Sequence, residues 1–98
     1  MKPVILVVDD EESVRESFRL ALQDEYALTF AEDAKSTLKL IKSQSFDLCL
    51  LDIMLPDGSG IDLLRQIKRR DEFIDVIMVT ALTSIDTALD AMKLGAYD

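Results

Sequence analysis

Apolar residues along the chain form short runs, separated by segments in which they recur every three or four positions. Three runs are continuous and mostly aliphatic, at residues 4–8, 46–51 and 76–79, a pattern typical of strands buried on both faces. A weaker run at residues 27–31 predicts a further strand. Strands that alternate with helical segments in this way predict an α/β domain built on a parallel sheet.

The periodic segments predict four helices, the first over residues 10–24 and the last beginning at a cap on Ser84. Acidic residues crowd the start of the first segment and basic residues 68–70 close the third, as the helix dipole favours. The apolar positions that mark the four helices are Val14, Phe18, Ala21 and Leu22; Ala34, Leu38 and Ile41; Ile61, Leu64 and Ile67; and Ile85, Ala88, Leu89 and Met92.

The composition narrows the class of protein. The chain has 98 residues, of which 49% are hydrophobic, enough for one small domain with its own core. Acidic residues outnumber basic ones by 19 to 11, and the net charge of −8 argues against nucleic-acid binding by this segment. Cys49 is the single cysteine and histidine is absent, so we expect no disulfide framework and no histidine-ligated metal. No apolar segment approaches the length of a membrane span, and we expect a cytoplasmic domain.

Oxygen-bearing side chains follow each of the three strong strands. In chain order they are Asp9 and Asp10, Asp52, and Thr80. Because the carboxyl ends of parallel strands lie along one edge of a sheet, we expect these side chains to converge if the strands are neighbours. Each has a simpler interpretation when taken alone, since acids cap helices, an aspartate often begins a turn and a threonine often ends a strand. Their coincidence at one edge favours a single site.

A cluster of carboxylates requires raised pKa values or a bound cation, because two of them about 5 Å apart repel by about 3 kcal/mol at an effective dielectric constant of about 20. Oxygen ligands without histidine or cysteine favour Mg²⁺, with Mn²⁺ as an alternative. A carboxylate beside such an ion is able to accept a phosphoryl group. Asp52 is the best candidate for this acceptor, because its strand is expected to be central. Asp9 and Asp10 would hold the metal, and the Thr80 hydroxyl would donate to a phosphate oxygen.

Four segments, "VVDDEES", "DLCLLDIMLPDGSGIDLLRQIK", "VIMVTA" and "AMKLGAYD", together resemble the receiver domain of two-component response regulators. The resemblance covers essentially the whole chain. It implies a flavodoxin-like, doubly wound parallel sheet with strand order 2-1-3-4-5. The segment "DGSG" lacks the lysine and the spacing of a P-loop, so a nucleotide-phosphate loop is disfavoured.

The resemblance also implies roles for individual residues. Asp52 resembles the phosphoacceptor, Asp10 resembles the direct Mg²⁺ ligand and Asp9 its acidic companion. Met54 would lend its backbone carbonyl to the metal. Thr80 resembles the switch hydroxyl that moves toward the phosphate, and Ala81 the small residue whose backbone N–H contacts it.

The chain departs from the family's pattern at its end. Receivers carry a fifth strand with an aromatic switch residue and then a lysine that pairs with the phosphate, whereas this sequence stops at Asp98. We therefore expect residues 1–98 to be a receiver domain that lacks its last strand and helix. A fragment or truncated sequence of a longer regulator is favoured over a deliberately shortened chain, and disorder of the last part is a further alternative.

The leading functional hypothesis is a phosphoacceptor signalling domain that is not an enzyme. A sensor histidine kinase would transfer a phosphoryl group to Asp52, and the change would switch a C-terminal output domain. Residues 84–98 resemble receivers joined to ATP-driven transcription activators, and a homodimer is a further candidate assembly. One alternative is a receiver-like module that binds partners without phosphorylation. Another, a Mg²⁺-dependent aspartyl-phosphate phosphohydrolase, is disfavoured because Met54 stands where such enzymes place a second acid.

Overall fold

A parallel sheet of four strands forms the centre of the computed structural model, which describes residues 1–79. Its strands are β1 (Val4–Val8), β2 (Ala27–Ala31), β3 (Leu48–Asp52) and β6 (Asp75–Val79). They lie in the order β2-β1-β3-β6, and every neighbouring pair is parallel. The predicted order 2-1-3-4 is confirmed, with β6 as the fourth predicted strand.

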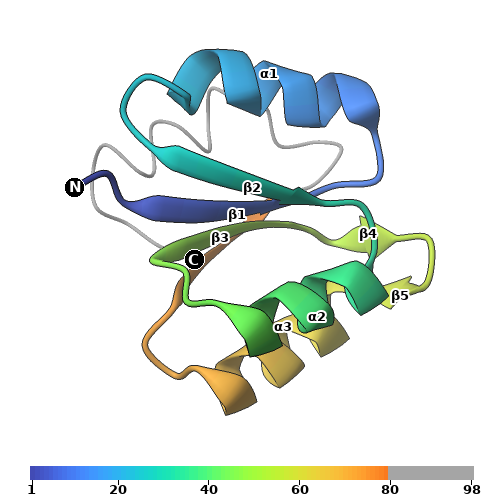
Figure 1. Ribbon diagram of the computed structural model, residues 1–98. Coiled ribbons are helices and arrows are strands. Elements are labelled where there is room, and N and C mark those ends of the chain that lie inside the picture. The colour runs from blue at the N-terminus through green and yellow to red at the C-terminus, as the bar shows by residue number, and fades with distance from the viewer. Residues whose placement is uncertain (80–98) are drawn as a thin grey trace.

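Three helices cover the two faces of the sheet, as a doubly wound fold requires. They are α1 (Glu12–Leu22), α2 (Ala34–Ser43) and α3 (Gly60–Arg70). Figure 1 shows α1 on one face and α2 with α3 on the other. None of the helices within residues 1–79 combines the length and the apolar character needed to cross a bilayer. The helix predicted from Ser84 lies outside the described residues.

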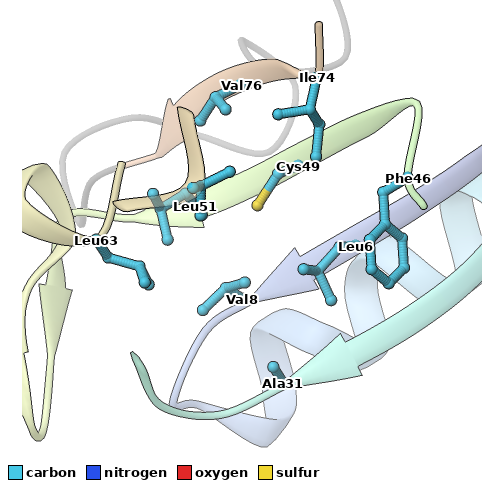
Figure 2. Packing of buried hydrophobic residues seen from close by; sticks show 10 residues of the cluster. Leu6, Val8, Ala31, Phe46, Cys49, Leu51, Leu63, Ile74 and Val76 are labelled. Atoms are coloured by element: carbon cyan, nitrogen blue, oxygen red, sulfur yellow. The ribbon is translucent and has the colours of Figure 1, made fainter. Parts of the chain in front are cut away.

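Alternate side chains of the strands supply two hydrophobic clusters, one on each face. On the α1 side, Ile5 and Val7 of β1 pack with Phe18 of α1. On the other side, Leu6 and Val8 pack with Leu63 of α3, and Figure 2 shows this second cluster with Leu51 and Cys49 of β3. Both faces of β1 and β3 are therefore buried, which explains why their sequences are continuously apolar.

Cys49 belongs to the core. Its side chain is fully buried in the cluster that Figure 2 shows, and burial raises the pKa of its thiol to about 12. The thiol is consequently neutral at physiological pH and acts as a small apolar side chain.

Three details of the predicted pattern differ from the structure. In α3 the predicted Ile67 is buried, but Leu63 is buried with it in place of Ile61, which is 48% exposed. The helix begins at Gly60, and the helical repeat then places residues 60, 63 and 67 on the inner face. In α1, Ala21 is exposed while Phe18 and Leu22 are buried. The predicted strand at residues 46–51 is shifted, because β3 begins at Leu48 and includes Asp52 as its last residue.

A small hairpin follows the central strand β3. Its strands, β4 (Met54–Leu55) and β5 (Gly58–Ser59), are antiparallel, and Pro56 and Asp57 connect them. The sequence predicted only a turn here. Gly58 has φ 157°, a value that residues with a side chain rarely adopt, and this explains the glycine at the second half of the hairpin.

Candidate functional site

The carboxyl ends of β1 and β3 bring three aspartates together. These two strands are neighbours, and Val8 of β1 lies opposite Leu51 of β3. The residues that follow in each strand direction, Asp9 and Asp52, are therefore adjacent at the same edge of the sheet. One carboxylate oxygen from each of Asp9, Asp10 and Asp52 lies within 4.8 Å of the other two. This set is the acidic cluster, and the predicted convergence of these three residues is confirmed.

The three carboxylates differ in burial and in their hydrogen bonds. Asp9 is buried, with 7% of its surface exposed, whereas Asp52 is half-buried and Asp10 is exposed. The backbone N–H of Glu11 donates to Asp9 Oδ1 at 2.9 Å, and the backbone N–H of Met54 donates to Asp52 Oδ1 at 3.1 Å. Each bond closes a local turn, so each carboxylate is oriented by the two residues that follow it.

Burial and mutual repulsion raise the pKa of two members of the cluster. For Asp9, burial is the largest cause, and the negative charges of Asp52, Asp10 and Glu11 raise the pKa further against the Glu11 hydrogen bond. The pKa of Asp52 is also raised, again first by burial and then by Asp10, against hydrogen bonds from the backbone. When no cation is bound, burial and mutual repulsion therefore make the fully ionised form of the cluster unfavourable.

No basic side chain within residues 1–79 forms an ion pair with the cluster. The ion pairs in this part of the chain join Arg19 to Glu16 and Arg65 to Asp62, both on helix surfaces. Arg15 lies next to the cluster, but its Nη1 donates to the backbone carbonyl of Asp9 at 2.7 Å. This bond holds the loop that carries two of the aspartates and leaves the charges of the carboxylates unpaired.

A close backbone contact fixes the chain after Asp52. The backbone N–H of Gly60 donates to the carbonyl of Ile53 at 2.7 Å, and the N–H of Ile53 donates to the carbonyl of Val79. A Cβ atom on Gly60 would lie 2.2 Å from the carbonyl oxygen of Asp52 and 2.7 Å from Cα of Ile53. Only glycine fits at this position, which explains the glycine that begins α3.

The donor set of the acidic cluster fits a hard divalent cation. All of its ligand atoms are carboxylate oxygens, and they lie close enough for one ion to contact all three. The chain contains no histidine, and the only thiol is buried in the core. Mg²⁺ or Mn²⁺ therefore suits the cluster better than zinc. Met54, the predicted carbonyl ligand, begins β4 two residues after Asp52, and its role stays a prediction.

Two residues that matter for the architecture of the site were not predicted. Arg15 and Asp57 each contact backbone atoms of another segment, at the Asp9 carbonyl and at the start of α2 respectively. Arg15 lies in α1, six residues after Asp9, and this short separation in the sequence was a weak available signal. For Asp57 no local signal exists, because its partners lie more than 20 residues earlier. Thr80 and Ala81 lie outside the described residues.

An open α/β sheet with a cluster of carboxylates at its carboxyl edge defines a doubly wound, flavodoxin-like protein. The family model described as the response regulator receiver domain matches residues 5–98. The chain belongs to this family, as the resemblance of its motifs predicted.

Individual relatives agree with this assignment. The chain is 42% identical over 95 residues to the alginate biosynthesis transcriptional regulatory protein AlgB of Pseudomonas aeruginosa. This match covers 96% of the chain and 21% of AlgB. It is 43% identical over 94 residues to the response regulator protein PilR of the same species, in a match that covers 95% of the chain and 21% of PilR. The chain thus spans about a fifth of the length of these curated relatives.

A solved structure shows the same fold. The CheY-like receiver domain protein of Methanospirillum hungatei is 31% identical to the chain and superposes with a TM-score of 0.81. The match covers 98% of the chain and 78% of that protein. The flavodoxin-like fold class is confirmed.

Proposed function

We propose that this chain is a phosphoacceptor signalling domain in which a sensor histidine kinase transfers a phosphoryl group to Asp52 in the presence of Mg²⁺. The observation that carries the proposal is the acidic cluster at the carboxyl edge of a receiver fold, with oxygens of Asp9, Asp10 and Asp52 within 4.8 Å of one another. Asp52 ends the central strand β3, and backbone N–H groups donate to its carboxylate and to that of Asp9.

In the proposed step a carboxylate oxygen of Asp52 attacks the phosphorus atom of the phosphohistidine. The bond from phosphorus to the imidazole nitrogen breaks, and the nitrogen keeps the electron pair and takes a proton from water. The product is an acyl phosphate on Asp52. The hydrogen bond from the Met54 N–H holds the attacking carboxylate in one orientation and so lowers the entropic cost of the reaction.

Asp9 and Asp10 would hold the cation together with Asp52, and the Met54 carbonyl would complete the set of protein ligands. A bound Mg²⁺ neutralises negative charge on the acceptor and on the phosphoryl group, and Mn²⁺ would serve similarly. Thr80 and Ala81 are proposed to contact the phosphoryl group through a hydroxyl and a backbone N–H. Met54 is an apolar residue that is 76% exposed, so it offers no acid or base for hydrolysis. This favours a switch over a phosphohydrolase.

The proposed output is transcriptional. AlgB is a transcriptional regulatory protein by name and PilR a response regulator protein, and the chain matches about a fifth of each. We propose that a C-terminal output domain, of the ATP-driven activator type that residues 84–98 resemble, responds to phosphorylation in the cytoplasm. A homodimer is a proposed assembly.

Intact mass after incubation with acetyl phosphate tests the acceptor. The native chain should gain the mass of one phosphoryl group when Mg²⁺ is present and none when the metal is chelated. Asp52→Asn should remove the gain entirely, because the amide is not a nucleophile of comparable strength. Asp33→Asn is the matched control, since it makes the same change in charge on a carboxylate outside the cluster, and it should retain labelling.

The outcomes separate the candidate functions. Labelling of the Asp52→Asn variant would assign the acceptor to another residue. No labelling of the native chain, but labelling of the same chain extended by downstream receiver sequence, would retain the acceptor and show that transfer depends on the extension. No labelling of either would favour the phosphorylation-independent interaction module.

A further inference from the structure

Asp57 joins the hairpin after the acceptor strand to a helix that lies much earlier in the chain. Its Oδ1 accepts from the backbone N–H of Ala34 at 2.8 Å, and its Oδ2 accepts from the backbone N–H of Lys35 at 3.1 Å. Both carboxylate oxygens are thus used on the first turn of α2, from a position between β4 and β5. Figure 1 shows this hairpin beside the start of α2.

The helix does not need Asp57 as its local cap. Asp33 is the N-cap residue of α2, and its Oδ1 accepts from the backbone N–H of Ser36 at 2.8 Å. That bond is the usual N-cap arrangement and leaves the N–H groups of the two preceding residues for another acceptor. Asp57 takes these two N–H groups, so the first turn of α2 is capped twice, once locally and once from the hairpin.

The contact matters for the hairpin because of what the hairpin carries. Met54, at the start of β4, donates its N–H to the acceptor carboxylate of Asp52. The other end of the hairpin returns to the acceptor strand through the bond from Gly60 to Ile53. Leu55 of β4 packs against the hydrophobic core, and in the described part of the chain the side-chain hydrogen bonds of the hairpin tip come from Asp57.

The strand order places the contact between Asp57 and α2 across the acidic cluster. The strand order is β2-β1-β3, so the end of β1, with Asp9 and Asp10, lies between the ends of β2 and β3. The hairpin leaves β3, and α2 follows β2. The contact of Asp57 with α2 therefore ties together the two segments that flank the acidic cluster on either side.

We propose that Asp57 is a positioning residue for the metal and acceptor site, acting through Met54 by fixing the β4–β5 hairpin against the first turn of α2. The inference rests on the proposed metal site at Asp9, Asp10 and Asp52. Binding of the cation and closure of the contact of Asp57 with α2 favour the same position of the hairpin, so each stabilises the other. Such coupling is reciprocal by necessity.

Reciprocity provides a test on the native chain. Hydrogen exchange of the Ala34 and Lys35 amides should slow about fivefold when Mg²⁺ is added, under conditions where exchange proceeds by local opening. The Ser36 amide is the internal control, because it is bonded to Asp33 in the same helical turn. Its exchange should be unchanged. Equal slowing of all three amides would indicate general stabilisation of α2 and would overturn the proposal.

Two matched variants test the opposite direction of the coupling, with Mn²⁺ alone as the probe and calorimetric titration as the measurement. Asp57→Ala should weaken Mn²⁺ binding about fivefold, or about 1 kcal/mol. Asp33→Ala removes the same charge and a cap of the same helix, and it should change the affinity by less than about twofold. Asp57→Asn keeps one acceptor oxygen without the charge, and it should recover part of the loss.

Failure of this inference is distinguishable from failure of the proposed function. A native chain that binds neither Mn²⁺ nor a phosphoryl group contradicts the proposed function itself. A native chain that binds Mn²⁺, together with equal affinities for Asp57→Ala and Asp33→Ala, retains the metal site and refutes the positioning role of Asp57.

Discussion

Two sets of aspartates lie at the carboxyl edge of the sheet, and they are stabilised in opposite ways. The acidic cluster of Asp9, Asp10 and Asp52 gathers carboxylates that repel one another, and the pKa values of Asp9 and Asp52 are raised. The carboxylates of Asp33 and Asp57, here called the α2 caps, each accept hydrogen bonds from backbone N–H groups of one helix. Hydrogen bonds from the side chain and backbone of Ser36 lower the pKa of Asp33.

The difference shows what an aspartate at a strand end contributes. A carboxylate that accepts N–H groups at a helix N-terminus is satisfied within the protein and favours its ionised form. A carboxylate that lies beside other carboxylates is satisfied only in part, even when it accepts one N–H of its own. Neutralising one of the α2 caps should therefore destabilise the fold, and neutralising a member of the acidic cluster should stabilise it.

The largest change in stability is expected at Gly60, which contacts the backbone of the segment between Asp52 of the acidic cluster and Asp57 of the α2 caps. Gly60→Ala would place a Cβ atom 2.2 Å from the Asp52 carbonyl oxygen, and the backbone on both sides would have to shift. We expect a loss of about 3 kcal/mol in the free energy of unfolding, measured by urea denaturation, because neither contact partner is a flexible side chain.

Gly58→Ala is the matched control for that substitution. Nothing lies within 4 Å of a Cβ atom at Gly58, so only its unusual φ opposes the change. We expect a loss of about 1 kcal/mol. Equal losses for the two variants would show that the close approach of Gly60 to β3 is not what limits this position.

An intermediate effect of opposite sign is expected in the acidic cluster. Asp52→Asn removes one repelling charge, so the metal-free protein should become more stable at neutral pH by up to about 1 kcal/mol, after allowance for solvent screening of a half-buried group. Chemical denaturation in the presence of a chelator measures the change. A clearly less stable variant would contradict the account of the cluster as repulsive.

The same variant has a defined pH dependence. Because the folded-state pKa values of Asp9 and Asp52 lie above the ordinary value of 3.8, the unfolded chain loses these protons first as the pH rises. The native protein then loses stability as the pH increases through the raised pKa values. The advantage of Asp52→Asn should therefore be absent below pH 3.8 and grow as the pH rises toward neutrality.

The smallest effect is expected at the local cap of α2. Asp33→Ala should destabilise the protein at neutral pH, because the Ser36 N–H loses its acceptor. The pKa of Asp33 is lowered in the folded state, so its contribution is present above the unfolded value of 3.8 and is lost as the pH falls through the folded value. Denaturation at neutral and acidic pH should show a deficit that shrinks in acid. A deficit that grows in acid would contradict the capping account.

Much of the fold was predictable because both faces of the central strands are buried. A strand covered on both faces must be apolar at every position, and this made β1, β3 and β6 visible as continuous runs. Helix faces were less certain. The prediction for α3 failed at Ile61 because the inner face is set by Gly60, whose place depends on contact with β3.

The acidic cluster was also predictable, for a topological reason. Parallel strands end at one edge, so aspartates that directly follow neighbouring strands must lie near one another. The roles of Thr80 and Ala81 remain predictions, because these residues lie outside the described part of the chain. The hairpin of β4 and β5 was not predicted, since a pair of two-residue strands leaves no periodic pattern to detect.

The sequence by itself determined which runs are continuously apolar, where strands end in carboxylates, and that no histidine competes for a metal. Only the tertiary structure decided which carboxylates are satisfied and which are not. Asp57 and Asp52 are five residues apart and chemically identical, yet one meets the N–H groups of α2 and the other meets Asp9 and Asp10. The electrostatic energy of a charge depends on the groups within a few ångströms of it, and folding brings those groups from distant parts of the chain.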